Sequence, residues 1–349
     1  MHNVLIIGAG LSGLSAAYFL SKKRIPFQVL EASGRPGGRI DTVQAQNGTS
    51  IEMGATWFAT KHKHLNALID DMGLRKFYQH DTGIALFESM SFSPPQQFDI
   101  PSAEEPYFRI ENGTSQLIES LLERIGKDKL VYHTPIIRIT NTKMGVELTS
   151  ANGEVFSGTA VFVTIPPRLL INSIHFEPSL PLDLQGLMKQ THTWMSESIK
   201  FGLAFPKDLW RRKGYSGTLY SQCGPVVEMY DHSDPEGSCC ALKGFLSGNA
   251  HHLGRKEREL VVKAQLDRLF GEGFSSNTEY VDKDWSKEAF IHYPYDGFIL
   301  PHQNNGHYLY QKPYWNDKLV FCGTETASAF GGYMDGAIQA ATRAVDDLF

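Results

Sequence analysis

The feature that most constrains the fold is an apolar run, Val4–Ile7, followed at once by Gly8, Gly10 and Gly13. A short run rich in β-branched residues predicts a buried parallel strand, and a helical pattern begins directly after Gly10. Gly8 allows a tight turn, Gly10 lets a phosphate approach the backbone, and Gly13 allows close packing of helix on strand. The N-terminus of the helix would then present free N–H groups to the phosphates of a dinucleotide.

A carboxylate and a second glycine-rich loop follow the next predicted strand. Phe27–Leu30 ends in Glu31, which is placed to accept hydrogen bonds from a ribose diol. The loop at residues 34–39 has the pattern G-R-x-G-G-R, and the guanidinium of Arg39 can form paired hydrogen bonds with a phosphate. These features together predict a dinucleotide site. A glycine-rich turn without a ligand is the alternative.

Composition narrows the function classes. A chain of 349 residues suggests two domains or one large one, and its net charge of −5 without a basic block argues against nucleic acid as a partner. We expect no membrane span, because no apolar run reaches the length that a span needs, and no leader sequence, because a strand begins near Met1. The four cysteines, Cys223, Cys239, Cys240 and Cys322, form no C-x-x-C pair, so we expect neither a metal site nor disulfides, and a cytoplasmic protein.

The periodicity predicts the remaining elements. A helical pattern covers 64–77, with Gly73 expected to close the helix, and further helices are expected over 115–125, 256–270 and 335–348. Strands are expected over 129–132, 136–139, 146–149, 155–156, 161–165, 196–205, 219–230, 241–246 and 318–322. The helix over 256–270 should bury Leu260, Val261, Ala264 and Leu269. Residues 78–108 read as a loop with one or two short strands, and the histidines at 62, 64, 251 and 252 as solvated surface.

Three segments carry a resemblance to a known family: the loop at 34–40, the stretch 321–326 and the stretch 332–337. The sequence resembles the flavin-containing amine oxidases, of monoamine oxidase type, over nearly its whole length. The resemblance implies an α/β fold in which a Rossmann-like FAD-binding domain with a parallel sheet is interleaved with an α+β substrate domain on a mixed sheet. We expect residues 1–76, 105–177 and 287–349 to form the FAD-binding domain, and residues 77–104 and 178–286 to form the substrate domain.

The resemblance also implies a set of cofactor-binding residues. Ile136 should contact adenine through its backbone, Trp285 should lie beside the flavin, and Met334 should lie at the pyrimidine edge of the ring. The full set is Gly8, Gly10, Leu11, Ser12, Gly13, Glu31, Ala32, Gly38, Arg39, Gly54, Ala55, Thr56, Trp57, Ile136, Trp285, Gly323, Thr324, Tyr333 and Met334.

Three residues resemble the family's catalytic groups. Lys200 resembles the lysine that holds a water at flavin N5, and Tyr295 and Tyr333 resemble two facing aromatic residues in front of the flavin. The reaction implied is hydride transfer from an amine to flavin N5, hydrolysis of the imine to aldehyde and ammonia, and reoxidation of the flavin by O2 with release of H2O2. The partners implied are a small-molecule amine and O2, with a homodimer as one possible assembly.

The sequence departs from the family at three places. Pro294 stands where the animal enzymes carry a cysteine bonded to the flavin, which predicts non-covalent FAD. Ser33 replaces an arginine on the adenine side, and the region between Trp57 and Arg109, which normally supplies helices over the substrate cavity, is much shorter. Two alternatives remain. One is a flavin-dependent oxidoreductase or desaturase that acts on a non-amine substrate, and the other is a flavin-bound scaffold without turnover.

Overall fold

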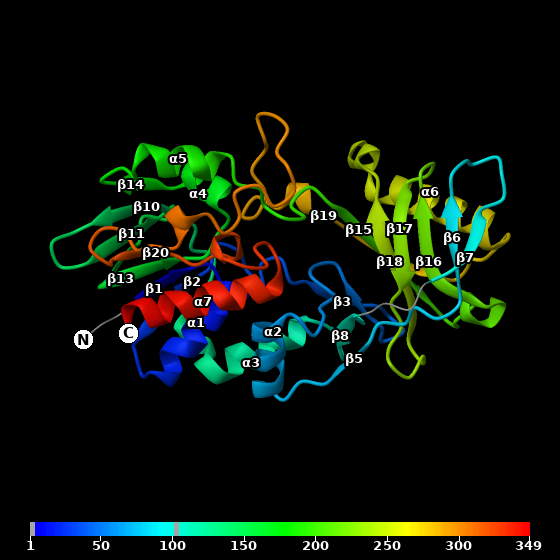
Figure 1. The fold of residues 1–349 in the computed structure, drawn as a ribbon, viewed down its shortest axis with the longest axis horizontal. Coiled ribbons are helices and arrows are strands. Elements are labelled where there is room, and N and C mark those ends of the chain that lie inside the picture. Colours follow the sequence, from blue (N-terminus) through cyan, green and yellow to red (C-terminus); the bar gives the residue numbers. More distant parts are fainter. Residues whose placement is uncertain (1–3, 101–104) are drawn as a thin grey trace.

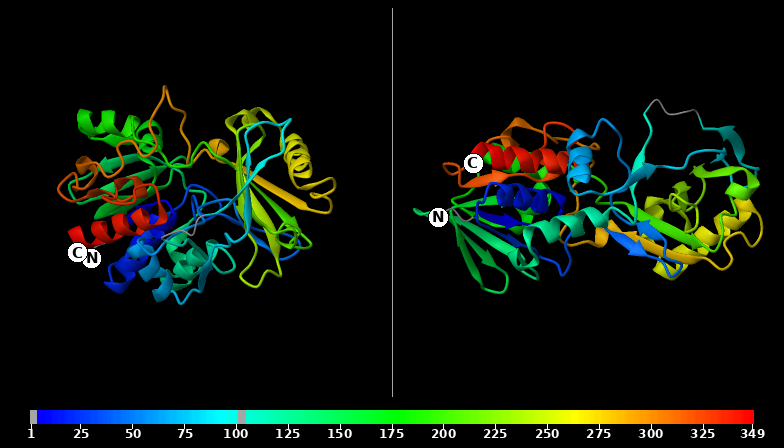
Figure 2. Two further views of the ribbon diagram at one scale, coloured as in Figure 1. Left: turned by 45° about the vertical axis from the view of Figure 1, so that its right-hand side comes forward. Right: turned by 90° about the horizontal axis from the view of Figure 1, so that it is seen from below.

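The computed structural model describes residues 4–100 and 105–349. Residues 1–3 and 101–104, which fall within the two predicted domains, lie outside the described residues. Figure 1 shows two lobes, one built around a five-stranded sheet and the other around a seven-stranded sheet. The rotated views of Figure 2 show the same two lobes, with helix α7 (Met334–Leu348) in the first of them.

The five-stranded sheet is parallel throughout, in the order β20-β13-β1-β2-β9. Its strands are β1 (Val4–Ile7), β2 (Phe27–Leu30), β9 (Leu130–Val131), β13 (Ala160–Val163) and β20 (Leu319–Phe321). One face packs on helices α1 (Leu11–Lys22), α2 (Lys63–Asp71), α3 (Ser115–Ile125) and α7. The burial of both faces explains why these strands are continuous apolar runs.

The other face of this sheet packs on a smaller layer. A four-stranded sheet in the order β12-β11-β10-β14 contains the hairpin predicted around residues 152–153. Its elements are β10 (Ile136–Asn141), β11 (Val146–Ser150), β12 (Val155–Gly158) and β14 (His175–Glu177), with helices α4 (Pro167–Ser173) and α5 (Leu182–Lys189) beside them. Together these layers confirm the predicted α/β arrangement.

The second lobe is a mixed sheet in the order β19-β15-β18-β17-β16-β6-β7. Its strands are β6 (Ile84–Glu88), β7 (Gln96–Asp99), β15 (Ile199–Phe205), β16 (Tyr215–Ser221), β17 (Val226–Asp231), β18 (Cys240–Leu246) and β19 (Glu279–Asp284). Only the β16–β6 pair is parallel. Helix α6 (Arg255–Phe270) covers one face, where it packs on Phe201 and Leu203 of β15.

The opposite face of the mixed sheet meets the first lobe. The hairpin of β3 (Thr42–Gln44) and β4 (Ser50–Glu52) crosses it, and a Cβ added at Gly202 would lie 2.4 Å from the side chain of Ile51. The alternation predicted for β15 is therefore present, but every residue of this strand is buried because both faces are covered. The exact division into two domains stays a prediction.

One prediction of local structure is confirmed in part and another is wrong. Helix α2 ends at Asp71, and Gly73, predicted to close it, follows with a positive φ of 69°. The rest of the segment 64–77 is not helical, because β5 (Lys76–Tyr78) pairs with β8 (Phe108–Ile110). In α6, Leu260 and Val261 are exposed, whereas the buried face carries the polar side chains of Arg258 and Gln265. Short 3-10 turns complete the fold at Lys127–Lys129, Arg211–Lys213, Gly248–His252, Trp285–Lys287, Tyr308–Tyr310 and Thr324–Thr326.

Within the ranges 4–100 and 105–349, the structure contains no helix with the length and apolar character that crossing a membrane requires.

Candidate functional site

The turn between β1 and α1 has the geometry that its glycines predict. Gly8 has a positive φ of 102°, and a Cβ added at Gly13 would lie only 2.0 Å from the carbonyl oxygen of Gly8. Only glycine therefore lets α1 begin so close to β1. Gly10, at the N-cap of α1, has no side chain to occupy the space in front of the first N–H groups of the helix.

Glu31 is fixed beside this turn. Its Oε2 accepts a hydrogen bond from the N–H of Ala9 at 2.7 Å, and its Oε1 accepts from the N–H and the hydroxyl of Ser33 at 2.8 and 2.6 Å. Ser33, where the family pattern has an arginine, thus orients the carboxylate. These bonds connect the end of β2 to the glycine turn.

A cavity of about 310 Å³ opens in front of the turn. Among the predicted cofactor residues it is lined by Gly8, Gly10, Leu11, Ser12, Glu31, Ala32, Gly38, Arg39, Ala55, Ile136, Thr324, Tyr333 and Met334. Gly13 and Gly323 line neither this cavity nor the next one, and both act through packing. A Cβ at Gly323 would lie 2.9 Å from the carbonyl oxygen of Thr164, at the end of the neighbouring strand.

A second cavity of about 960 Å³ lies between the two lobes. The predicted residues that line it are Arg39, Gly54, Ala55, Thr56, Trp57, Lys200, Trp285, Tyr333 and Met334. Arg39, Ala55, Gly332, Tyr333 and Met334 line both cavities, so the two are adjoining parts of one elongated site. Arg39 is held at this junction by an ion pair of 2.6 Å with the fully buried Glu325.

Lys200 reaches this second cavity from β15. Its Nζ donates a hydrogen bond of 2.6 Å to the carbonyl oxygen of Gly54, and it lies 5.1 Å from the centre of the Phe245 ring. Burial lowers the pKa of Lys200 to about 8, with Glu52 and Glu228 acting in the opposite direction. A buried lysine whose pKa is lowered toward neutral pH, next to a large cavity, is a candidate functional group.

Trp285 supports the same wall. Its indole N–H donates a hydrogen bond of 2.7 Å to the carbonyl oxygen of Met53, next to the residue that Lys200 contacts. Two side chains therefore hold consecutive carbonyl groups of the segment 53–54, and Gly54 lines the cavity.

The structure differs from prediction at Tyr295. Tyr295 lines neither cavity; its ring stacks on His192, and its hydroxyl accepts a hydrogen bond from the N–H of Thr193. The expected pair of Tyr295 and Tyr333 is therefore not formed. Tyr333 instead stacks on His302 at 5.2 Å and lies 6.0 Å from the ring of Trp194, which lines the cavity.

Several residues of the second cavity were not predicted from the sequence. His62 is buried rather than solvated, with its ring against Phe330, and burial lowers its pKa. Trp194, Glu228 and Tyr230 also line the cavity. Alternation along β17 would have placed Glu228 and Tyr230 on one face, but their sequence does not show which face the cavity uses.

Segment 78–108 contributes to the wall despite its short length. The residues of this segment that line the second cavity are Gln79, His80, Asp81, Phe98, Ile100 and Tyr107.

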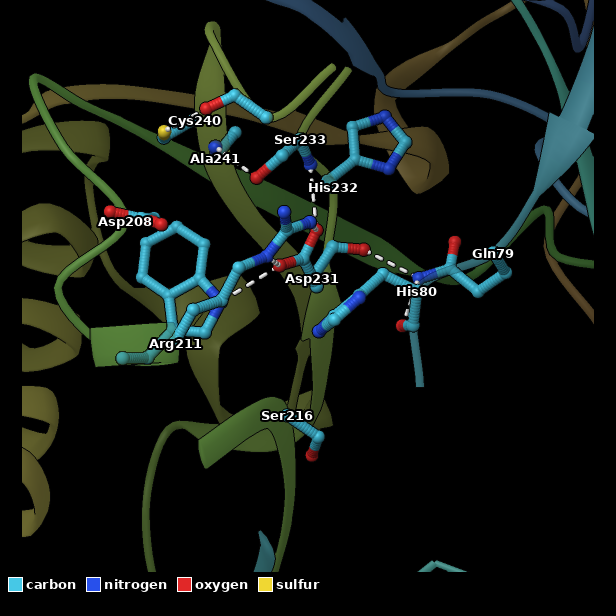
Figure 3. Close-up of polar contacts among 12 residues, drawn as sticks. Gln79, His80, Asp208, Arg211, Ser216, Asp231, His232, Ser233, Cys240 and Ala241 are labelled. Carbon is cyan, nitrogen blue, oxygen red and sulfur yellow. Dashed lines mark hydrogen bonds and ion pairs between the residues drawn. The ribbon is translucent and has the colours of Figure 1, made fainter. Parts of the chain in front are cut away.

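A buried polar cluster attaches this wall to the mixed sheet. Gln79 accepts from the indole N–H of Trp57 at 2.8 Å and donates to the carbonyl oxygen of Asp231 at 2.7 Å. Figure 3 shows Asp231 at the centre, paired with Arg211 and accepting from the N–H of Ser233. The position of Trp57 therefore depends on the end of β17.

The described residues contain no group of three or more His, Cys, Asp or Glu side chains positioned to hold a metal ion, and the four cysteines are free.

Comparison with known proteins gives a consistent picture. A family profile described as flavin containing amine oxidoreductase matches residues 11–89 and 83–349. The chain is 24% identical to a Dictyostelium discoideum protein named "Probable flavin-containing monoamine oxidase A", over an alignment that covers 100% of this chain and 97% of the relative. That alignment runs over 451 positions, more than the 349 residues of this chain, so the relative carries insertions.

Two solved structures have the same fold. Cyclohexylamine oxidase from Brevibacterium oxydans superposes with a TM-score of 0.85 at 20% identity, covering 99% of this chain and 98% of that chain. A putrescine oxidase with putrescine bound gives a TM-score of 0.85 at 19% identity and the same coverage.

Proposed function

Because this chain belongs to the family of flavin-containing amine oxidoreductases, we propose that it oxidises a small-molecule amine with non-covalently bound FAD and with O2 as the electron acceptor. The observation that carries the proposal is the elongated site, in which a glycine turn and Glu31 line one end and Lys200 lines the other.

The residues present fit FAD. The space in front of Gly10, the fixed carboxylate of Glu31 and the guanidinium of Arg39 suit an adenosine diphosphate moiety in the smaller cavity. Backbone of Gly54 and Ala55, together with Trp285 and Lys200, would hold the isoalloxazine ring in the larger cavity.

The positions of the cysteine thiols support non-covalent binding of FAD. None of the four cysteines, all of them in the described part of the chain, lines either cavity, and the carbonyl oxygen of Pro294 accepts hydrogen bonds from Arg168. The residue at the family's cysteine position thus offers no nucleophile to the ring.

When bound, the flavin would accept hydride from the α-carbon of the amine and pass its electrons to O2. The protein would orient the amine and exclude water from the site. Tyr333 and Trp194, whose rings lie next to each other in the lining of the larger cavity, would offer aromatic surface that orients the amine. The apolar rings around the cavity would favour the uncharged amine, since desolvation disfavours an ammonium group.

Lys200 and helix α7 would supply electrostatic stabilisation. Lys200 would place a positive charge where dioxygen is reduced. The N-terminus of α7 begins at Met334, in the lining of both cavities, and its positive dipole end would stabilise negative charge there.

The test is the visible spectrum of the purified protein before and after anaerobic addition of aromatic and aliphatic amines. We expect a flavin spectrum that an amine bleaches, H2O2 on readmission of air, and release of FAD into the supernatant by acid precipitation. A colourless protein that does not take up FAD would refute the proposal. A yellow protein that no amine bleaches would favour a non-amine substrate or a non-catalytic scaffold.

A further inference from the structure

The cavity wall formed by the mixed sheet contains an ordered row of side chains. Lys200 on β15 pairs with Phe245 on β18, Phe245 pairs with Glu228 on β17, and Glu228 pairs with Tyr220 on β16. Residues directly opposite each other on antiparallel strands point to the same face, and all four line the large cavity. Figure 1 shows these four strands side by side in the second lobe.

The row fixes the separation of its charged ends. Neighbouring strands lie about 4.8 Å apart, so Lys200 and Glu228, two strand steps apart, are separated by about 10 Å between their backbones. The ring of Phe245 occupies the wall between them, beneath the Nζ of Lys200. One cavity wall therefore carries a cation at Lys200 and, two strands away, an anion at Glu228.

The carboxylate of Glu228 can accept further hydrogen bonds from a ligand. It is half-buried, and its Oε1 accepts a hydrogen bond from the hydroxyl of Tyr230. Within residues 4–100 and 105–349, no ion pair joins it to a lysine, arginine or histidine. By contrast, Asp335 in the same lining accepts from the N–H of Leu65 and lies beside His64.

The surroundings of Glu228 are aromatic. Tyr220 and Phe245 flank it in the row, and the ring of Trp57 packs edge-on against Tyr230 at 5.1 Å. Glu228 acts to raise the pKa of Lys200 and of Lys243, but neither ammonium group forms an ion pair with it. A partly desolvated carboxylate without a cation in direct contact, among aromatic rings, suits an organic cation.

From this arrangement we infer that the substrate carries a second, protonated nitrogen, and that Glu228 binds this ammonium group while the reacting amine lies near Lys200. The inference rests on the proposed function, because the position of the reacting amine comes from it. The inference predicts that diamines and longer polyamines are better substrates than monoamines. The two structural neighbours do not decide between these classes, because one is named for a diamine and the other for a monoamine.

The test compares the flavin-loaded protein with its Glu228→Gln variant on linear diamines, from diaminopropane to diaminooctane, and on alkylamines of the same chain lengths. Gln keeps the oxygen that accepts from Tyr230, so folding should be preserved. Two readouts are needed: the rate of flavin reduction without oxygen, and amine binding by calorimetry. A matched control is Glu236→Gln, which changes an exposed carboxylate on the loop between β17 and β18.

We expect a diamine of suitable length to be preferred over its monoamine, and Glu228→Gln to lower diamine kcat/KM and affinity by roughly tenfold to a hundredfold, the range for a lost hydrogen bond to a charged group. The loss for monoamines should be much smaller than the loss for diamines, because a monoamine has no second ammonium group to bind. The control variant Glu236→Gln should stay within about twofold of the unmodified protein, the spread of neutral surface changes. Asp81→Asn removes the charge of another carboxylate that lines the cavity and should leave the preference for diamines unchanged.

The outcomes separate the two ideas. Three results would overturn the inference and leave the amine oxidase function in place. They are flavin reduction without a preference for diamines, equal losses for both amine classes in Glu228→Gln, and loss of the preference in Asp81→Asn instead of Glu228→Gln. Diamine binding that requires Glu228 without any flavin reduction would support the inference as a binding site and refute the proposed function. If no amine binds or reacts, both are refuted.

Discussion

Replacing the buried lysine of the site by an apolar residue should stabilise the protein. Lys200 is 5% exposed, and Lys200→Met keeps the length of the side chain while removing its charge. Below pH 8 the folded protein carries a protonated lysine that burial disfavours, whereas the unfolded chain holds the same proton in water. The variant is free of this penalty.

The magnitude follows from the pKa of Lys200. The difference between the ordinary value of 10.5 and the value of about 8 in the folded protein corresponds to about 3 kcal/mol. Loss of the hydrogen bond from the charged Nζ to Gly54 offsets about 2 kcal/mol of this. We therefore expect a net gain of about 1 kcal/mol at pH 7. With an unfolding entropy of about 2.1 cal/mol/K per residue, this raises Tm by about 1 to 2 °C.

The pH dependence gives the prediction a sign that can be checked. Between pH 8 and 10.5 the unfolded chain binds more protons at this site than the folded protein, so the stability of the unmodified protein rises with pH. The advantage of Lys200→Met should shrink over the same interval and reverse at its upper end, where only the lost hydrogen bond counts.

The assay is thermal and urea unfolding of both proteins from pH 6 to pH 10, with the exposed Lys127→Met as control. We expect the control to follow the unmodified protein at every pH. A Lys200→Met variant that is less stable at pH 7, or whose advantage does not change with pH, would refute the reasoning that burial dominates at this lysine. The same variant should slow flavin reoxidation by O2, and an unchanged reoxidation rate would remove the oxygen role assigned to Lys200.

Three other substitutions test separate parts of the structure. Gly13→Ala should abolish flavin binding, measured by absorbance, because its Cβ would overlap the carbonyl oxygen of Gly8, whereas Gly186→Ala in α5, with open space around it, should bind flavin normally. Asp231→Asn should lower the unfolding free energy by about 2 to 4 kcal/mol in urea titrations, since it removes the buried partner of Arg211. Gln79→Leu should raise KM for amines more than it changes kcat, since it frees Trp57, and an unchanged KM would contradict that role.

The parallel sheet and its glycine turn could be predicted because the signals are local. The apolar runs of β1 and β2 stand next to the glycines and the carboxylate that they position, so order along the chain already gives proximity. Lys200 is an intermediate case. Its alternation with Gly202 and Ala204 placed it on the correct face of β15, but the burial of that face comes from Ile51, a residue of a distant hairpin.

The remaining parts of the site depend on contacts that periodicity does not encode. Tyr295 lies in a stretch without regular structure, and its position follows from His192 and Thr193, about a hundred residues away. The face of α6 was misjudged for a similar reason. Arg258 and Gln265 are buried because their side chains donate hydrogen bonds to Asp282 on β19 and Glu88 on β6. A hydrophobicity scale ranks arginine and glutamine as surface residues, so it does not predict this face.

The order of the parallel sheet has a consequence for biosynthesis. Strand β1 at Val4–Ile7 pairs with β13, whose outer neighbour β20 begins only at Leu319, and α1 packs against α7. The glycine turn is therefore translated before the mixed sheet, yet the layer that supports it is completed by residues that leave the ribosome after the whole mixed sheet. A nascent chain paused before β20 would already contain the mixed sheet, while its nucleotide pocket would still lack one wall.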